Sequence, residues 1–235
     1  MHALVTGSTG FIGVHLVATL VARGWRVRCL VRSSSRREPL AAYNVDYVVG
    51  SLQDRESLRQ AVTGVEVIFH LAGATRVRVP ADYERINTEG TKNLIEVCMA
   101  SPTLLRKFLF ISSIAAAGPS RTGKALTEED LPRPVGPYGQ SKLQAETAVL
   151  ACKEQLPVIV LRPSAIYGPQ DTDFFRLFQA IKYGMLPHIG RRDLHVDLCF
   201  VADLVHDMVA AAEHDGGLGE VFFLGGTCHT WREFG

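Results

Sequence analysis

A tyrosine and a lysine lie four residues apart in the segment Tyr138-Gly139-Gln140-Ser141-Lys142. Residues at this spacing share one face of a helix. A phenol is a poor base at neutral pH because its unperturbed pKa is about 10, but a neighbouring ammonium stabilises the phenolate. The pair could therefore act as a general acid/base, and the lysine could also donate to hydroxyl groups of a ligand. Tyr-x-x-x-Lys is common by chance, so its meaning depends on its surroundings.

Two serines, Ser112 and Ser113, end an apolar run that begins at Lys107 and predicts a buried strand. In an open parallel sheet the carboxyl ends of the strands form the ligand crevice. A serine at such an end could donate a hydrogen bond to a substrate oxygen. A serine that is merely buried and satisfied is the alternative.

A glycine turn, Gly7-Ser8-Thr9-Gly10-Phe11-Ile12-Gly13, lies between a predicted strand and a predicted helix. In this context Gly7 permits a tight turn, Gly10 lets the backbone approach a pyrophosphate, and Gly13 allows close helix–strand packing. The helix N-terminus favours the diphosphate charge. The turn predicts dinucleotide binding, with Thr9, Phe11 and Ile12 among the contacts; a plain strand-to-helix connection is the alternative.

The end of the second predicted strand carries Arg32, nineteen residues after Gly13, and the segment Ser33-Ser34-Ser35-Arg36-Arg37 follows it. This is the place where an acidic residue would bind the adenosine ribose and repel a 2′-phosphate. A guanidinium with hydroxyls beside it suits a phosphate dianion instead. We therefore expect NADP(H) to be favoured, with NAD(H) still possible. A solvated basic loop is the alternative.

Strand-like and helix-like segments alternate along the chain, which predicts an α/β fold, a doubly wound parallel sheet of the Rossmann type. The predicted strands are residues 2–6, 26–31, 47–49, 65–71, 107–112, 158–161 and 220–224. The predicted helices are residues 11–22, 54–62, 82–99, 138–153, 174–183 and 202–213, with another opening at 230–233. The Pro- and Gly-rich stretch 115–137 predicts a long functional loop.

Composition adds limits on partners and location. The chain has 235 residues, 25 Lys plus Arg against 24 Asp plus Glu, and 47% apolar residues, which gives no reason to expect nucleic acid or a membrane as a partner. Met1 leads directly into a strand-like segment, and the five scattered cysteines form no Cys-x-x-Cys pair. We therefore expect no signal peptide and a cytoplasmic protein. The spacing of His188, His195 and His206 matches no metal-ligand set, so no metal is expected.

Taken together, the motifs resemble those of the extended short-chain dehydrogenase/reductases, the group labelled NAD-dependent epimerase/dehydratase. The resemblance covers nearly the whole chain and rests on segments that occur in the family's order: Val5 to Gly13, Phe69-His70-Leu71-Ala72-Gly73-Ala74, Asn87-Thr88-Glu89-Gly90-Thr91, Phe110-Ile111-Ser112-Ser113, Tyr138 to Lys142, and Leu161-Arg162-Pro163-Ser164-Ala165-Ile166-Tyr167-Gly168-Pro169.

The resemblance implies roles for these residues. Tyr138 would be the general acid/base, Lys142 would tune it and bind the nicotinamide ribose, and the 25-residue spacing selects Ser113 over Ser112 as the serine that polarises the carbonyl or alcohol. Further contacts to the cofactor would come from Leu71, Ala72, Gly73, Asn87, Pro163 and Ile166. Hydride would move between the nicotinamide and a secondary alcohol or ketone. Relatives commonly form homodimers through the helices at 82–99 and 138–153.

Three departures from the family pattern bear on specificity. Gly50-Ser51-Leu52 stands where Gly-Asp-Leu is usual, so Ser51 replaces the acid that binds the adenine amino group. Val196 stands where nucleotide-sugar members carry a diphosphate-binding arginine, although Arg191 or Arg192 could substitute. Relatives also usually continue further, so we expect a dinucleotide-binding and catalytic domain over residues 1–165 and a partial, apparently truncated substrate-binding region, interleaved with the last strands, over 166–235.

Three functions remain open from the sequence. A reductase resembling the dihydroflavonol reductases or 3β-hydroxysteroid dehydrogenases would exchange NADPH at every turnover, and Arg32 and Val196 favour it. A nucleotide-sugar epimerase or dehydratase would hold NAD tightly. A dinucleotide sensor without catalysis is a third class, against which the complete set of Ser113, Tyr138 and Lys142 argues. In every case the remaining ligand would be a small molecule.

Overall fold

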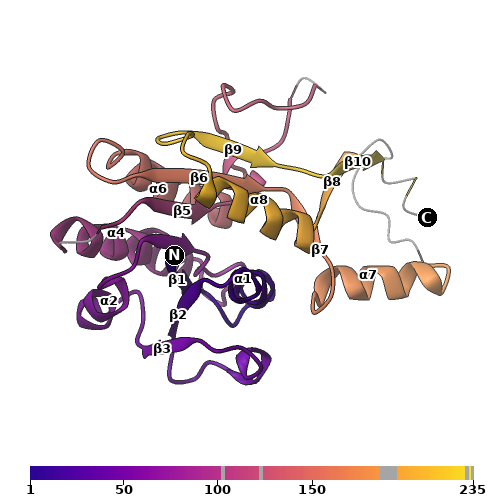
Figure 1. Ribbon diagram of the computed structural model, residues 1–235. Helices are drawn as coiled ribbons and strands as arrows, with labels where there is room; N and C mark the ends of the chain where they lie inside the picture. The colour runs from indigo at the N-terminus through magenta and orange to yellow at the C-terminus, as the bar shows by residue number, and fades with distance from the viewer. Residues whose placement is uncertain (102–103, 122–123, 186–194, 231–232, 234–235) are drawn as a thin grey trace.

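The computed structural model describes residues 1–101, 104–121, 124–185, 195–230 and 233, and its centre is a seven-stranded parallel sheet (Figure 1). The strand order is β3-β2-β1-β4-β5-β6-β9. The strands are β1 (His2–Thr6), β2 (Arg26–Val31), β3 (Asp46–Val49), β4 (Val67–His70), β5 (Lys107–Ile111), β6 (Val158–Pro163) and β9 (Val221–Leu224). All neighbouring pairs run parallel, which confirms the predicted doubly wound fold.

The strand order reverses at β1, and this reversal positions the functional site. From β1 the chain proceeds outward to β2 and β3, and it then returns to place β4, β5 and β6 on the other side of β1. The loops after β1 and β4 therefore leave the sheet in opposite directions, and a crevice opens between them at the carboxyl ends of the strands.

Helices cover both faces of the sheet (Figure 1). One core layer lies between the sheet and α1 (Phe11–Ala22) and α8 (Val201–Glu213), and the other lies under α2 (Arg55–Val62), α4 (Gly90–Ala100) and α6 (Pro137–Leu150). Every residue of β4 and β5 is buried, as expected for strands covered on both faces. Asp54 is the N-cap of α2, because its side chain accepts a hydrogen bond from the Glu56 backbone N–H.

The helix predicted over residues 82–99 is not uniform. It consists of α3 (Ala81–Tyr83), a π-helical turn η2 (Glu84–Glu89) and α4. The wider turn buries Asn87 and Thr88, and the Thr88 hydroxyl donates to the backbone oxygen of Ser141 in α6 at 3.0 Å. Apolar periodicity could not distinguish this turn from regular helix, because the deciding contacts are made to a residue more than fifty positions away. The stretch predicted as a long loop begins with a short helix, α5 (Ile114–Ala117).

A second, three-stranded sheet lies beyond the edge of the main one. It has the order β10-β8-β7, with β7 (Ala165–Tyr167), β8 (His195–Phe200) and β10 (Thr227–Thr230), and α7 (Asp173–Lys182) lies near it. The prediction that a helix begins at Thr230 is wrong, because Thr230 belongs to β10 and pairs with His195 in an antiparallel arrangement. Residues 231 and 232 of that predicted helix lie outside the described part. A short 3-10 turn, η1 (Glu38–Leu40), follows β2. No helix in the described part is long and apolar enough to cross a membrane.

Candidate active site

Two adjoining cavities lie at the carboxyl ends of the central strands. The larger has a volume of about 900 Å³ and extends from the glycine turn to the loops after β2, β3 and β4. The smaller has a volume of about 140 Å³ and lies at the ends of β5 and β6 under α6. Four residues line both cavities and connect them: Leu71, Gly73, Ala74 and Thr75. The site is therefore a continuous crevice with a wide and a narrow part.

The glycine turn adopts a geometry that side chains would prevent. Gly7 has a φ of +73°, and a Cβ at this position would lie 2.8 Å from the backbone nitrogen of Ala72. A Cβ on Gly13 would lie 2.2 Å from the backbone oxygen of Gly7. Gly10 is the N-cap of α1 and lines the large cavity, and the first turn of α1 contains no acidic residue. The positive end of this helix is therefore open to an anion.

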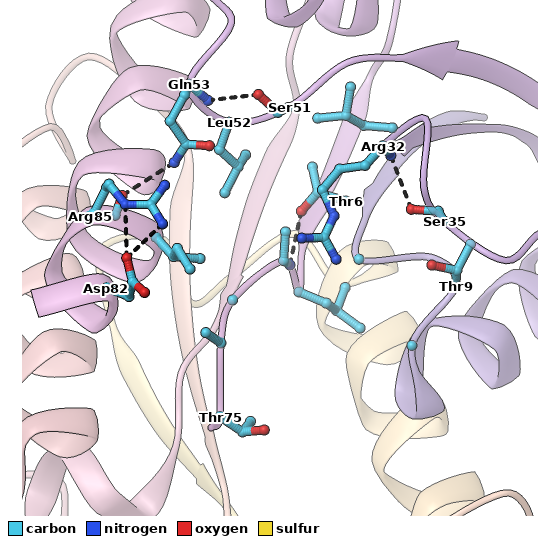
Figure 2. Close-up of a pocket in the computed structure, with 18 of the residues that line it drawn as sticks. Thr6, Thr9, Arg32, Ser35, Ser51, Leu52, Gln53, Thr75, Asp82 and Arg85 are labelled. Atoms are coloured by element: carbon cyan, nitrogen blue, oxygen red, sulfur yellow. Dashed lines mark hydrogen bonds and ion pairs between the residues drawn. The ribbon is translucent and has the colours of Figure 1, made fainter. Parts of the chain in front are cut away.

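Cationic side chains line the large cavity. Arg32, Arg76, Arg78 and Arg85 contribute four positive charges, and Asp82 contributes one negative charge. Arg85 is paired with Asp82, and Arg76 is paired with Asp173 of α7. Figure 2 shows Arg32 extending from its strand end into the cavity, where Ser35 also lies. The lining suits a ligand that carries several phosphate charges.

The loop after β3 forms another wall of the large cavity. The Ser51 hydroxyl accepts a hydrogen bond from the Gln53 backbone N–H at 3.3 Å, and Gln53 donates to the backbone oxygen of Arg85 at 3.2 Å (Figure 2). The second of these bonds ties the loop to η2. Ser51 and Leu52 both line the cavity, at the position predicted for adenine binding.

The small pocket brings together the three residues predicted to be catalytic. Ser113 is the N-cap of α5, accepts from the Ala115 backbone N–H at 3.2 Å, and lines the same pocket as the Tyr138 side chain. Gly139 makes this meeting possible, because a Cβ there would lie 2.3 Å from the backbone oxygen of Ala115. Burial raises the pKa of Tyr138, while the nearby Ser113 hydroxyl acts to lower it.

Lys142 lies one helical turn after Tyr138 and is buried. Its ammonium donates to the backbone oxygen of Ile111 at 2.7 Å and lies 4.2 Å from the centre of the Phe110 ring. Burial lowers the pKa of Lys142 to about 7, although the Glu146 carboxylate acts to raise it. Lys142 and Tyr138 line the same small pocket, and an ammonium that approaches a phenol favours the phenolate.

This shift predicts a pH-dependent stability. The unfolded lysine keeps its proton up to about its ordinary pKa of 10.5, whereas the folded one releases it near 7. The unfolded state therefore binds more protons between these values, and stability rises with pH there. Between pH 7.5 and pH 9 we expect the free energy of unfolding of the wild type to gain about 2 kcal/mol relative to Lys142→Met.

Urea denaturation of both proteins at the two pH values measures this gain. Lys92→Met is the control, because Lys92 is exposed and paired with Glu89, and its difference from the wild type should stay constant. A pH-independent difference for Lys142→Met as well would contradict the buried, shifted ammonium.

Two further hydroxyls in the small pocket lack partners. The Oγ atoms of Ser112 and Ser164 are buried without a hydrogen bond to any described residue, and both residues line the pocket. A buried polar atom without a partner is costly unless a ligand or water satisfies it. Together with the remaining donors of Lys142, they fit a ligand that brings its own polar atoms, as the ribose and carboxamide of a nicotinamide nucleotide do.

The structure brings most of the predicted site residues to this crevice. The large cavity is lined by Gly7, Thr9, Gly10, Arg32, Ser51, Leu52, Leu71, Ala72 and Gly73. The small pocket is lined by Ile12, Leu71, Gly73, Ser113, Tyr138, Lys142, Pro163 and Ile166. Three predicted cofactor residues line neither: Phe11, Gly13 and Asn87. Asn87 is buried and instead holds the backbone of Ala74 through both its amide oxygen and its amide nitrogen.

Several lining residues were not predicted from the sequence. They include Gln53 and the segment from Thr75 to Arg78 after β4. The strand end at His70 is the sequence signal for that segment, because loops at the carboxyl ends of strands form the crevice. Val196 lies on β8 and lines neither cavity, and His188, Arg191 and Arg192 lie outside the described residues. No group of three potential metal ligands occurs in the part of the chain that is described.

Comparison with known proteins agrees with this arrangement. The family model "NAD dependent epimerase/dehydratase family" matches residues 3–225. A 4-hydroxy-2-methyl-3-oxo-4-farnesyl-3,4-dihydroquinoline-1-oxide ketoreductase from Stigmatella aurantiaca is 33% identical over 229 residues, which are 95% of this chain and 68% of that protein. A 3-beta-hydroxysteroid dehydrogenase from Mycolicibacterium neoaurum is 32% identical over 95% of this chain and 65% of that protein. The chain thus spans about two thirds of the length of these relatives.

Solved structures show the same fold. The crystal structure of a UDP-glucuronic acid 4-epimerase from Bacillus cereus in complex with NAD matches with a TM-score of 0.87 and 26% identity, over 99% of this chain and 80% of that one. The relatives include NAD(P)-dependent epimerases and reductases of the extended short-chain dehydrogenase/reductase type. The chain belongs to the NAD-dependent epimerase/dehydratase family.

Proposed function

We propose that this chain forms the dinucleotide-binding and catalytic part of an NADP(H)-dependent reductase that interconverts a ketone and a secondary alcohol. The observation that carries the proposal is the meeting of Ser113, Tyr138 and Lys142 in a narrow pocket that opens into the cavity of the glycine turn. Relatives named as a ketoreductase and a hydroxysteroid dehydrogenase support this choice of reaction.

The residues of the small pocket have distinct parts in this proposal. The Tyr138 hydroxyl gives its proton to the carbonyl oxygen of a ketone, and Ser113 donates a hydrogen bond to the same oxygen. The Lys142 ammonium stabilises the phenolate that remains. Reduced nicotinamide, when bound, supplies the hydride to the carbonyl carbon, so the ketone gains one hydride and one proton and becomes an alcohol. The reverse reaction uses the Tyr138 phenolate as the base.

Arg32 carries the preference for the phosphorylated dinucleotide. Its side chain reaches into the large cavity, and the Ser35 hydroxyl lies beside it and accepts from the Arg32 backbone N–H at 3.1 Å. A guanidinium–phosphate contact contributes about 1.5–3 kcal/mol, so Arg32→Ala should weaken NADPH binding by about 10- to 100-fold. NADH affinity should change less than twofold. Isothermal titration calorimetry with both dinucleotides measures the two effects.

Arg37→Ala is the matched control for that titration. Arg37 belongs to the same basic segment, but its guanidinium lies 5.2 Å from the centre of the Tyr47 ring and it does not line the cavity. Its loss should leave both affinities unchanged. If the wild type binds NADH as tightly as NADPH, and Arg32→Ala changes neither affinity, the phosphate contact does not exist.

An epimerase that retains NAD is the second candidate, and the likeness to the UDP-glucuronic acid 4-epimerase supports it. Val196 stands where nucleotide-sugar members of the family carry a diphosphate-binding arginine, and this argues against an epimerase. Releasing and identifying any nucleotide that remains bound after purification separates the candidates. Stoichiometric NAD favours the epimerase, and an empty protein that oxidises NADPH with a ketone favours the reductase. Dinucleotide binding without turnover of any ketone, alcohol or nucleotide sugar favours a sensor.

A further inference from the structure

His70 is a fully buried histidine whose two ring nitrogens both have hydrogen-bond partners. Nδ1 lies 2.7 Å from the Thr6 hydroxyl, and Nε2 lies 2.9 Å from the Thr91 hydroxyl. The ring packs among Phe108 and Phe110, with centroids 6.1 and 5.5 Å away. Burial lowers the pKa of His70 to about 3, so the ring is neutral at physiological pH. A neutral imidazole has one donor and one acceptor, and its neighbours must fit that order.

The neighbours determine which nitrogen carries the proton. The Thr91 hydroxyl donates its only proton to the backbone oxygen of Asn87 at 2.6 Å, so it must accept from His70 Nε2–H. Nδ1 is then the acceptor and receives the Thr6 hydroxyl proton. The Thr6 oxygen in turn accepts from the Ala72 backbone N–H at 3.1 Å. All donors of this chain of bonds, which we call the His70 relay, point from Ala72 toward Asn87.

The first end of the His70 relay lies in the cofactor crevice. Thr6 and Ala72 both line the large cavity, and Thr6 directly precedes Gly7 of the glycine turn. Gly7 also approaches the backbone of Ala72 so closely that a Cβ would be excluded. The relay therefore fixes the distance between the turn after β1 and the loop after β4.

The second end of the His70 relay is the backbone oxygen of Asn87 in η2. This turn contacts α6, the helix that carries Tyr138. The Asn87 amide accepts from the Ala74 backbone N–H at 2.7 Å and donates to the Ser141 hydroxyl at 2.9 Å. Ser141 donates to the backbone oxygen of Tyr138 at 2.8 Å. The π-helical turn that contains Asn87 is thus held by β4 on one side and by α6 on the other.

We propose that His70 is a positioning residue that couples the cofactor crevice to the helix carrying Tyr138. Each donor in the His70 relay has one acceptor, so the loss of one bond leaves a buried donor or acceptor unpaired. The imidazole is then no longer held in one tautomer. A substitution at Thr91 should therefore weaken the hydrogen bond at Thr6 and lower the affinity of the crevice for the dinucleotide. The inference rests on the proposed dinucleotide binding and deepens it.

Thr91→Val tests this coupling, because Thr91 lines neither cavity and its replacement has nearly the same shape. Calorimetric titration should show NADPH and NADH both bound about three- to tenfold more weakly, which is the worth of one buried neutral hydrogen bond. Thr91→Ser keeps the hydroxyl and should keep wild-type affinity. In a His70→Phe background, Thr91→Val should cause no further loss, because the connection is already broken.

A second pair of variants keeps the test decisive if Thr91→Val does not fold. His70→Asn places an amide oxygen near the position of Nδ1 and can keep the bond from Thr6. His70→Gln places an amide nitrogen near the position of Nε2 and can keep only the bond to Thr91. His70→Asn should therefore bind the dinucleotides more tightly than His70→Gln.

The outcomes separate this inference from the proposed function. A wild type that binds neither dinucleotide refutes the proposed function and the coupling with it. If the wild type binds a dinucleotide and Thr91→Val binds it equally well, the coupling alone is refuted. The same holds if Thr91→Val lowers dinucleotide affinity by the same factor in the wild type and in His70→Phe. Equal affinities of His70→Asn and His70→Gln also refute it.

Discussion

Replacing Tyr138 by phenylalanine should lower kcat by about 10²- to 10⁴-fold and leave dinucleotide affinity within about twofold of the wild type. The substitution removes only the hydroxyl, which is the group that transfers the proton, and keeps the ring in its place beside Tyr83 at a centroid distance of 5.8 Å. Turnover is measured as loss of reduced-nicotinamide absorbance with a ketone substrate found by panel screening. Calorimetry gives the affinity.

Tyr83→Phe is the matched control. Its hydroxyl donates to the backbone oxygen of Thr75, so this variant also loses one tyrosine hydroxyl and one hydrogen bond at the same site. We expect kcat to fall by less than about tenfold, because a single neutral hydrogen bond contributes about 1 kcal/mol. If Tyr138→Phe retains the wild-type rate, Tyr138 is not the proton donor and the proposed mechanism is wrong.

Removing the Glu146 carboxylate should lower the free energy of unfolding by about 3–5 kcal/mol. Glu146 in α6 and Arg162 in β6 are 1% and 3% exposed and form a bidentate ion pair. The Nε–Oε1 and Nη2–Oε2 distances are 3.0 and 2.7 Å. Glu146→Ala leaves an uncompensated guanidinium in the core. In a chain of this size the loss corresponds to a fall in Tm of about 10 °C. Urea denaturation at pH 7.5 and thermal unfolding measure it.

The surface pair of Arg23 and Glu213 provides the comparison. Its side chains are 37% and 38% exposed, so Glu213→Ala should cost less than about 1 kcal/mol. The double variant Glu146→Leu with Arg162→Met should recover much of the lost stability, because two apolar side chains leave no buried charge. Equal losses in Glu146→Ala and Glu213→Ala would mean that the Arg162 charge is solvated in the folded protein.

The parts of the fold that the sequence predicted correctly depend on local patterns. The central strands β4 and β5 appear as apolar runs because they are buried on both faces, and Asp54 is recognisable as a cap from its position before a helix. The second sheet was missed. Its strands are three to six residues long, half-exposed, and paired with partners 29 to 35 residues away, so no local period indicates them.

A similar division holds for the candidate site. Types and spacing indicated the glycine turn and the pair of Tyr138 and Lys142, and the resemblance to a family gave that pair its role and selected Ser113. The π-helical turn at Asn87 and the unpartnered hydroxyls of Ser112 and Ser164 could not be predicted. They depend on contacts between β4, α6 and the ends of β5 and β6, which only the folded chain brings together.

Calorimetric titration of the wild-type protein with NADPH shows whether the crevice between β1 and β4 binds a nicotinamide dinucleotide. We expect saturable binding at one site per chain, with NADH competing for the same site. If neither dinucleotide binds saturably to a protein shown to be folded, the crevice is not a dinucleotide site and the proposed function is wrong.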